Sequence, residues 1–315
     1  MKKEIKIGTR GSKLALWQAN WVKSALTARN SSLSVEIVPI KTKGDKILDV
    51  ALAKVGGKGL FVKEIEEALL NGHIDLAVHS MKDMPSEIPN GLCVGAIPQR
   101  ETPQDVLISR KGLLLSQLGQ NARIGTSSLR RTAQLLHVRP DLVISPLRGN
   151  LDTRLKKLDA ENLDAIILAA AGVKRLGLER RITEYLDEKI ILPAVGQGAL
   201  CIEIRENDPE VRSIITLLEH HETRTVVMGE RAFLNRLEGG CQVPVAAHGK
   251  IEKNRFTLCG LVATVDGTTV IRETLSGQKD SSEIIGVTLA DRLIEMGAKT
   301  IMENLKVEPD KDHER

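Results

Sequence analysis

The chain has 315 residues, of which 42% are hydrophobic and 27% charged, and its formal net charge is +4 at pH 7. This length is enough for two or three domains with ordinary buried cores. Only 2% of the residues are aromatic, so the chain has few of the stacking side chains that nucleic-acid binders use. The sequence has no apolar run of the ~18 residues that a membrane-spanning helix needs, and it shows no signal-peptide pattern. We therefore expect a cytoplasmic protein that binds neither a membrane nor nucleic acid.

One sequence pattern occurs twice along the chain. Residues 7–12 read IGTRGS and residues 124–128 read IGTSS, and each segment precedes apolar residues with helical spacing. Later in each half an acidic residue opens a short apolar run, at residues 75–78 and again at residues 164–168. Short apolar runs that alternate with helical periodicity predict βα units around a mostly parallel sheet. We therefore expect two similar α/β domains that face each other across a cleft.

The pattern changes after residue 209, where helices precede a group of short strands. The expected elements are helices over Val211–His220 and Thr225–Leu237, strands over Val245–Ile251, Arg255–Val265 and Thr268–Leu275, and a helix over Ser282–Leu305. Asp266 and Gly267 lie between the last two strands and are a hairpin signal. This order of elements predicts a small α+β domain at the end of the chain.

We expect the four cysteines to be reduced thiols, because the chain has no C-x-x-C pair that would indicate a zinc site or a redox motif. Cys93, Cys201 and Cys259 lie in apolar, strand-like runs, where a free cysteine behaves as a small hydrophobic residue. Cys241 differs because it follows two glycines, which let the backbone pass close to a bulky group. Such a thiol is suited to attachment or nucleophilic attack, although an inert turn cysteine would have the same local sequence.

Basic residues concentrate in the middle of the chain. Residues 123–181 contain nine arginines and three lysines against six acidic residues. Arg10, Arg130 and Arg131 lie close to the two Gly-Thr segments, where hydroxyl residues can begin helices. Helix N-termini and guanidinium groups both bind carboxylates, and arginine does so through two parallel hydrogen bonds. The sequence therefore predicts a site for acidic ligands, with N-capping and solvated surface charges as the alternative interpretations.

Five short motifs span nearly the whole chain. They are VHSMKDMP at residues 78–85, GTSSLRR at 125–131, LRGN at 147–150, PAVGQG at 193–198 and LEGGC at 237–241. In this order they resemble the motifs of the porphobilinogen deaminase (hydroxymethylbilane synthase) family. That family acts in tetrapyrrole (porphyrin) biosynthesis, of which haem biosynthesis is a part. The resemblance implies two α/β domains of periplasmic-binding-protein type (type II) and a smaller α+β domain with a three-stranded antiparallel sheet. It places the first domain at residues 1–98 with 198–219, the second at 99–197 and the third at 220–315.

The resemblance also implies a transferase that acts as a monomer. Enzymes of this family join four porphobilinogen molecules head to tail on a bound dipyrromethane primer, and they release ammonia and the linear tetrapyrrole hydroxymethylbilane. By resemblance Cys241 carries the primer through a thioether. Asp83 would be the catalytic residue, since a fixed carboxylate stabilises the cationic methylene-pyrrole that remains when ammonia departs. Read without the family, an Asp before Met-Pro indicates a turn or a helix cap.

Further site residues follow from the resemblance. The implied ligands of the primer are Ser80, Lys82, Asp83, Thr126, Ser127, Arg130, Arg131, Arg148 and Gly149. The implied ligands of porphobilinogen are Arg10, Ser12, Lys58, Phe61, Arg148, Arg154, Arg175 and Gln197. For Arg175 a solvated surface position is an equally open alternative. No metal site is expected, because His220 and His221 have no third ligand at a suitable spacing.

Two other classes of protein are alternatives to the enzyme. A non-catalytic carboxylate receptor built from two facing α/β domains would also explain the arginines, but it gives no role to a Gly-Gly-Cys segment in a third domain. A nucleic-acid binder is disfavoured by the scarcity of aromatic residues and the modest net charge. A covalently bound primer would separate the enzyme from both.

Overall fold

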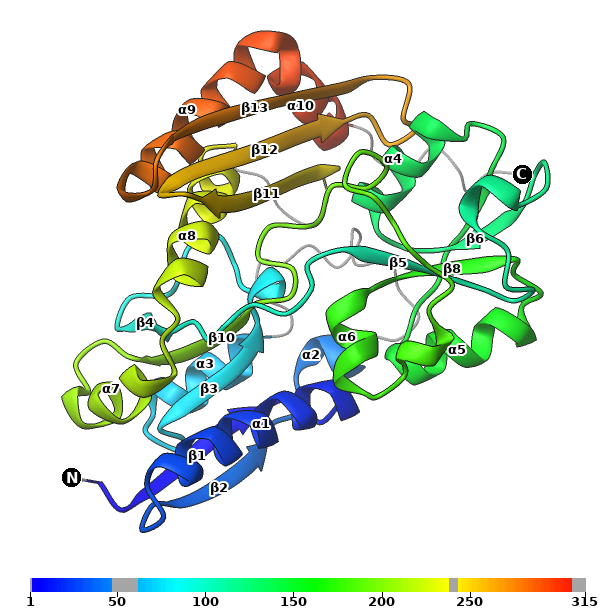
Figure 1. The fold of residues 1–315 in the computed structure, drawn as a ribbon. Helices are drawn as coiled ribbons and strands as arrows, with labels where there is room; N and C mark the ends of the chain where they lie inside the picture. The colour runs from blue at the N-terminus through cyan, green and yellow to red at the C-terminus, as the bar shows by residue number, and fades with distance from the viewer. Residues whose placement is uncertain (1, 47–61, 238–242, 308–315) are drawn as a thin grey trace.

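The computed structural model describes residues 2–46, 62–237 and 243–307. Figure 1 shows three parts, which we call the first half, the second half and the C-terminal unit. The first half is drawn mainly in blue and cyan, and the second half mainly in green. The C-terminal unit lies beside both and contains the orange and red elements.

The first half is built on a five-stranded sheet with the strand order β2-β1-β3-β10-β4. Its strands are β1 (Glu4–Thr9), β2 (Ser34–Pro39), β3 (Leu76–Ser80), β4 (Leu92–Ala96) and β10 (Leu200–Arg205). The α-helices among its described residues are α1 (Lys13–Arg29), α2 (Lys43–Lys46), α3 (Lys63–Leu70) and α7 (Pro209–Ile215). The strand β10 comes back from the second half and pairs with both β3 and β4, so the chain completes this sheet late.

The second half is built on a sheet of the same size with the order β7-β6-β8-β5-β9. Its strands are β5 (Asp105–Ser109), β6 (Arg123–Gly125), β7 (Val143–Ser145), β8 (Ala165–Ala169) and β9 (Glu184–Tyr185). Its α-helices are α4 (Leu129–Val138), α5 (Leu151–Ala160) and α6 (Ala170–Arg175). The strands β6 and β8 and the helix α4 carry the residues of the second copy of the sequence pattern.

The two sheets follow the same plan, which confirms the repeat expected from the sequence. In each sheet one strand runs antiparallel to both of its neighbours, β10 in the first half and β5 in the second. The other two pairs in each sheet are parallel, so four of the five strands run in one direction, as predicted, although half of the strand pairs are antiparallel. Each antiparallel strand is the first that the chain forms after crossing from the other half. Its direction therefore depends on topology, which a local pattern does not contain.

The repeat extends to local contacts. The carboxylates of Asp75 and Asp164 each accept a backbone N–H from the strand alongside, at 2.8 and 2.9 Å. The glycines of the two Gly-Thr pairs are also equivalent. A Cβ added at Gly8 would lie 2.2 Å from a buried side chain, and one added at Gly125 would lie 2.7 Å from another. A Cβ at either position would therefore displace the neighbouring side chain, which favours glycine at both.

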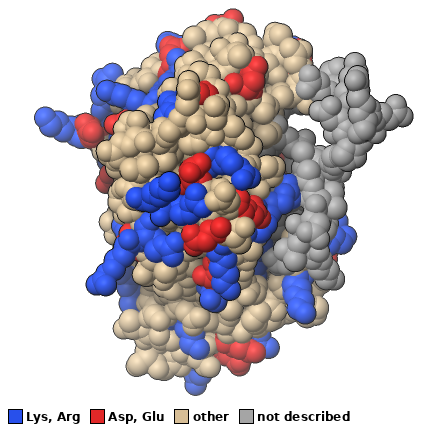
Figure 2. Space-filling model, turned by 90° about the vertical axis from the view of Figure 1, so that its right-hand side faces the viewer, with Lys and Arg blue, Asp and Glu red and all other residues tan. Residues whose placement is uncertain are grey.

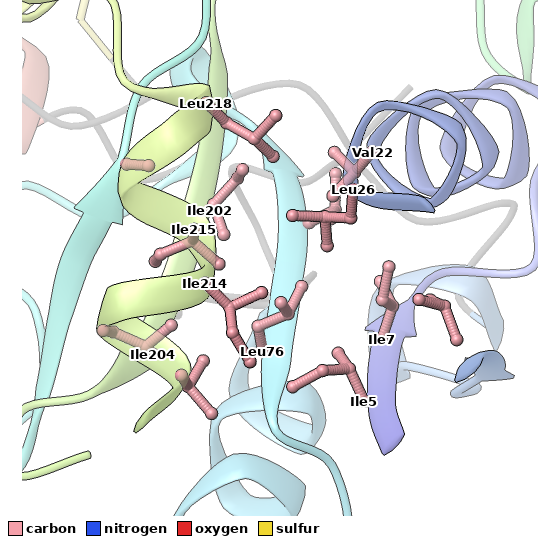
Figure 3. Packing of buried hydrophobic residues seen from close by; sticks show 14 of the residues in the cluster. Ile5, Ile7, Val22, Leu26, Leu76, Ile202, Ile204, Ile214, Ile215 and Leu218 are labelled. Carbon is pink, nitrogen blue, oxygen red and sulfur yellow. The ribbon is translucent and has the colours of Figure 1, made fainter. Parts of the chain in front are cut away.

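An aliphatic core holds the first half together, as the scarcity of aromatic residues requires. The buried side chains labelled in Figure 3 are Ile5, Ile7, Val22, Leu26, Leu76, Ile202, Ile204, Ile214, Ile215 and Leu218. They come from β1, α1, β3, β10, α7 and the turn after α7. Full burial of one such side chain stabilises the fold by ~1.5–3 kcal/mol. The returning strand β10 is therefore part of this core.

The C-terminal unit is a three-stranded antiparallel sheet packed against helices. Its strands are β11 (Val245–Glu252), β12 (Arg255–Ala263) and β13 (Val270–Gln278), in that order. The helices α8 (His221–Arg236) and α9 (Ser282–Leu293) pack against each other and against the sheet. Two α/β halves and a smaller α+β unit with this sheet confirm the fold class expected from the sequence.

The structure corrects the last predicted helix. The single helix expected over Ser282–Leu305 is divided into α9 and α10 (Lys299–Val307). Between them Gly297 has a φ of 104°, which no α-helix contains. Glycine adopts this conformation without a steric penalty, so it redirects the chain within the π-helical turn Ile294–Ala298 that joins the two helices.

The helices around residue 220 also begin and end at other residues than predicted. The helix α7 ends at Ile215 and continues as a single 3₁₀ turn over Thr216–Leu218. The helix α8 begins at His221, four residues before the predicted start. The ring of His220 accepts the backbone N–H of Thr223 and caps the helix, a role that histidine rarely signals in a sequence.

Two segments, residues 97–104 and 193–199, connect the halves, and we call them the crossing segments. They lie side by side, since the N–H of Glu101 donates to the carbonyl of Gly198 at 3.2 Å. Gly198 has a φ of 88°, and a Cβ there would lie 2.3 Å from the carbonyl oxygen of Glu101. The close approach of the crossing segments therefore depends on glycine at this position.

The helix α8 joins the C-terminal unit to the crossing segments through Glu230. This side chain is fully buried, and it accepts hydrogen bonds from Arg100 at 2.6 and 3.2 Å. It also accepts the backbone N–H groups of Gly196 at 2.8 Å and Gly249 at 2.9 Å. One carboxylate thus binds both crossing segments and the first strand of the C-terminal sheet.

Candidate active site

The end of β3 carries the first group of predicted site residues. Ser80 is the last residue of the strand, and its hydroxyl accepts a hydrogen bond from a buried glutamine of α1 at 2.9 Å. A single 3₁₀ turn, Met81–Asp83, follows. Its first residue is buried and donates its N–H to the second crossing segment at 3.0 Å. The turn is therefore anchored at its start, while the Asp83 side chain at its end is exposed.

Lys82 reaches toward the second half through Gln197. The Lys82 Nζ lies 3.4 Å from Gln197 Oε1, and Gln197 Nε2 donates in turn to Asp105 at 3.2 Å. Burial lowers the pKa of Lys82 to about 8, while the charge of Asp83 opposes this change and that of Arg131 adds to it. Lys82 therefore belongs to the same charged group as the arginines of the second half.

Arg130 and Arg131 of α4 are buried and pair with Asp105. Arg130 Nη1 donates to one carboxylate oxygen at 2.7 Å, and Arg131 donates to the other from Nε at 2.9 Å and Nη2 at 2.6 Å. Asp105 is 0% exposed. Burial alone would raise the pKa of Asp105, but the two guanidinium charges hold it well below its usual range. Both predicted ligand residues thus have a carboxylate of the protein itself as a partner.

Asp105 is a site residue that the sequence analysis missed. It opens the apolar run DVLIS, just as Asp75 and Asp164 open theirs. That shared pattern was a usable signal, because it marks a carboxylate at the beginning of a buried strand. The pattern does not distinguish the roles, however. Asp75 and Asp164 each accept a backbone N–H from the neighbouring strand, whereas the hydrogen bonds that described residues donate to the Asp105 carboxylate all come from side chains.

The loop before α5 is fixed by hydrogen bonds from the predicted hydroxyl residues. Ser127 Oγ donates to the carbonyl of Leu147 at 3.1 Å and accepts its N–H at 2.9 Å. The Thr126 hydroxyl is buried and accepts the N–H that follows Ser127 at 3.2 Å. Gly149 has a φ of 108°, and its carbonyl accepts Arg154 Nε at 2.9 Å. The Ser127 hydroxyl therefore shapes the LRGN loop that carries Arg148, while the Thr126 hydroxyl binds the residue that precedes α4.

The two halves bring Asp83 and Arg154 into one electrostatic environment. Burial lowers the pKa of Arg154 to about 10, and the positive charges of Arg131 and Arg148 act in the same direction. The negative charge of Asp83 opposes them, although Asp83 belongs to the first half. The exposed carboxylate of the first half and the cations of the second half are therefore close enough to interact electrostatically.

Arg175 is held at the crossing segments and is not a solvated surface charge. Its Nη2 donates to the carbonyl of Gly198 at 2.7 Å, and its guanidinium carbon lies 5.9 Å from the ring centre of Trp17. Burial lowers its pKa to about 10. The alternative of a solvated position is therefore wrong, and Arg175 connects α6, α1 and a crossing segment.

Arg10 and Ser12 lie where α1 begins. The Ser12 hydroxyl accepts the N–H of Ala15 at 3.3 Å, so the alternative role as an N-cap is confirmed for this residue. Lys13 of the same turn pairs with Asp152 of α5 at 2.8 Å. Figure 1 shows α1 beside α6, and the two helices are in contact. The start of α1 thus meets the second half.

Three predicted site residues, Cys241, Lys58 and Phe61, lie outside the described residues. The structure places the other three cysteines in β4, β10 and β12, which confirms the interpretation of their apolar runs. Burial, followed by the charge of Glu203, raises the pKa of Cys201 far above its usual value. Cys201 is therefore protonated and inert at neutral pH.

Other classes of site find little support among the residues that the structure describes. Within these ranges no cluster of three or more His, Cys, Asp or Glu side chains could hold a metal ion. Within the same ranges no helix has the length and apolar content to cross a membrane. Figure 2 shows acidic and basic side chains mixed on one face of the molecule, in contrast to the uniformly basic surface of nucleic-acid binders.

The geometry defines a class of protein, a three-part α/β protein with its charged site between two similar halves. Two α/β halves of the same topology hold a cationic site at their junction, and a third unit is attached to the segments that cross between them. Residues 5–213 match the family described as porphobilinogen deaminase, dipyrromethane cofactor binding domain, and residues 224–295 match the porphobilinogen deaminase C-terminal domain. The chain belongs to the porphobilinogen deaminase family.

Curated relatives agree over nearly the full length. The chain is 56% identical to a porphobilinogen deaminase of Pelobacter propionicus over 96% of this chain and 97% of that protein. It is 53% identical to one of Carboxydothermus hydrogenoformans over 97% of this chain and 98% of that protein. A TRAP periplasmic solute binding protein of Desulfovibrio salexigens covers 70% of this chain and 73% of its own, with 10% identity and a TM-score of 0.42. A likeness at that score carries no information about function.

Proposed function

We propose that this protein is a transferase that condenses four porphobilinogen molecules on a dipyrromethane primer and releases ammonia and hydroxymethylbilane. The observation that carries the proposal is the charged group at the junction of the halves, where the charge of the exposed Asp83 acts on both Lys82 and Arg154, and that of Arg131 acts on the same two residues. Porphobilinogen carries an acetate and a propionate, and cations of this kind bind carboxylates. Asp83 and Asp105 are the two carboxylates of this group, and the cations Lys82, Arg130, Arg131, Arg148 and Arg154 outnumber them, which leaves positive charge for the ligand.

The donor groups of the site fit a primer that carries several carboxylates. Arg130 binds Asp105 and a backbone carbonyl through Nη1 alone, so its Nε and Nη2 groups have no hydrogen-bond partner among the described residues. When bound, the primer supplies the pyrrole carbon to which porphobilinogen is joined. We assign to its binding Ser80, Lys82, Asp83, Thr126, Ser127, Arg130, Arg131, Arg148 and Gly149, with Cys241 as the attachment point.

Asp83 acts on the charge that develops in the substrate. Departure of the amino group of porphobilinogen as ammonia leaves a cationic methylene-pyrrole, and a carboxylate already in place stabilises that charge. The anchored turn Met81–Asp83 supplies this preorganisation, because its first residue is buried and its last is exposed. The same carboxylate can accept a proton during coupling.

The remaining residues assigned to the substrate line the junction and the start of α1. They are Arg10, Ser12, Arg148, Arg154, Arg175 and Gln197, with Lys58 and Phe61 outside the described residues. Arg175 and Gln197 also bind the crossing segments. They would therefore act on the substrate partly by fixing the position of the two halves.

Turnover separates this function from a carboxylate receptor. The purified protein is incubated with porphobilinogen, and the consumption of substrate, the release of ammonia and the formation of a linear tetrapyrrole are followed. The proposal predicts four ammonia molecules for each tetrapyrrole and no turnover in Cys241→Ser, which loses the thiolate nucleophile. Binding of porphobilinogen without its consumption would support the receptor.

We further propose that the protein works as a cytoplasmic monomer with domain boundaries at residues 1–98 with 198–219, 99–197 and 220–315. Free thiols at Cys93, Cys201 and Cys259 support a reducing compartment. Light scattering of the purified protein tests the monomer, and limited proteolysis tests the boundaries.

A further inference from the structure

Two cations of the site, Arg130 and Arg131, converge on Asp105, a residue that has no role in the proposed chemistry. Its two oxygens accept hydrogen bonds from Arg130, from Arg131 and from Gln197, which in turn lies against Lys82. Asp105 is the first residue of β5, immediately after a crossing segment, and it is completely buried. One carboxylate thus contacts groups of both the second half and the crossing segments.

Asp105 uses different parts of the two guanidinium groups. Arg131 donates to Asp105 from Nε and Nη2, and it donates to a backbone carbonyl from Nη1 at 2.9 Å. Arg130 donates only from Nη1, to Asp105 at 2.7 Å and to a backbone carbonyl at 2.8 Å. The Nε and Nη2 groups of Arg130 form the edge that binds a carboxylate through two parallel hydrogen bonds. Among the described residues this edge of Arg130 has no partner, whereas the same edge of Arg131 is occupied.

A second Arg–Asp pair in the same half shows how a purely structural arginine uses its hydrogen-bond donors. Arg139 donates to Asp141 from Nε and Nη2, both at 2.7 Å. Its Nη1 and Nη2 also donate to three backbone carbonyls at 3.0 to 3.2 Å. No complete two-donor edge of Arg139 is left without a partner from the described part of the chain. The pair at Asp105 differs because the described residues leave one two-donor edge, that of Arg130, without a partner.

We propose that Asp105 is a positioning residue that orients Arg130 so that its Nε and Nη2 edge binds a carboxylate of porphobilinogen or of the primer. Arg131 serves mainly to hold Asp105 in place, so the two arginines have unequal roles. A buried arginine without a partner is costly, and Asp105 lets the site exist before a ligand arrives. The inference rests on the proposed function, since that function supplies the carboxylate.

Paired lysine variants test the unequal roles. Lysine keeps the charge but has no two-donor edge. Arg130→Lys should lower kcat/KM by on the order of 10²-fold, mainly through KM, and should reduce the fraction of protein that carries the primer by intact mass. Arg131→Lys should lower the melting temperature more than Arg130→Lys does and should affect KM less. Equal effects on KM, or a larger effect from Arg131→Lys, would overturn the inference.

Variants of Asp105 test the positioning itself. Asp105→Glu keeps the charge but moves the carboxylate by one methylene, so KM should rise and primer content should fall, as for Arg130→Lys. Asp141→Glu is the matched control, and its KM and primer content should equal those of the wild type. Wild-type KM and full primer content in Asp105→Glu would contradict the inference. If Asp105→Glu does not fold, the lysine variants decide the question. A wild-type protein without primer and without turnover would instead refute the proposed function.

Discussion

Asp83 carries the central chemical role in this account, and its exposed position allows a clean test. Asp83→Asn keeps the size of the side chain and removes the charge. We expect turnover to fall by on the order of 10²-fold or more, as when one preorganised group is removed from a transition state. The melting temperature should stay unchanged, because the side chain is exposed. Steady-state kinetics with primer content checked by mass measures the effect, and near-native turnover would move the catalytic role to another residue.

Lys82 predicts a pH dependence in the affinity for substrate. Its pKa is lowered from 10.5 to about 8, so its positive charge is lost as the pH rises through about 8. Since a neutral amine binds carboxylates weakly, KM for porphobilinogen should rise above this pH. Lys82→Arg stays charged throughout and should remove that rise. The profile of KM between pH 7 and 9 in both proteins is the measurement, and identical profiles would show that Lys82 does not titrate in this range.

The sequence led to the residues of the site, but it did not reveal which side chains pair with each other there. The family motifs led to Asp83, Lys82 and the arginines, and the structure brings these side chains to one junction. They did not lead to Asp105, because its partners Arg130 and Arg131 lie on a helix about 25 residues further along the chain. A pairing across that distance depends on how β5 and α4 pack, which no local pattern contains.

Among the elements, the second crossing segment depends on Gly198. Alanine there would need a φ of 88° and would place its Cβ 2.3 Å from a backbone oxygen. Gly112 has a φ of 72° with open space around it, so Gly112→Ala measures the conformational cost alone. We expect that cost to be about 1 kcal/mol and the cost of Gly198→Ala to be larger by about 2 kcal/mol or more. Urea unfolding of both variants gives the difference, and equal losses would mean that the segments do not approach so closely.

The elements show where local patterns suffice and where they fail. Hydrophobic periodicity predicted the βα units and the three strands of the C-terminal unit. It did not reveal that β5 and β10 run antiparallel, because direction in a sheet depends on the path of the chain. It also joined α9 and α10 across Gly297, since the apolar spacing continues through a residue whose φ of 104° breaks the helix.

At the scale of the whole molecule, Glu230 holds the C-terminal unit to the crossing segments. Glu230→Gln removes a fully buried charge that pairs with Arg100 at 2.6 Å. The uncompensated guanidinium should cost about 3–5 kcal/mol of unfolding free energy. The exposed pair of Arg236 and Asp291 is the control, and Asp291→Asn should cost ~0–1 kcal/mol. Chemical denaturation measures both, and a loss from Glu230→Gln as small as that of the control would show that this contact does not stabilise the assembly.

Intact mass of the purified protein, before and after addition of porphobilinogen, tests the central claim most directly. The account predicts that the protein as isolated is heavier than its sequence by a dipyrromethane unit, and that the added mass lies on a peptide that contains Cys241. Substrate should then produce a series of heavier species, each larger by one pyrrole unit. A protein that turns over porphobilinogen while its mass equals that of the unmodified sequence would contradict the account.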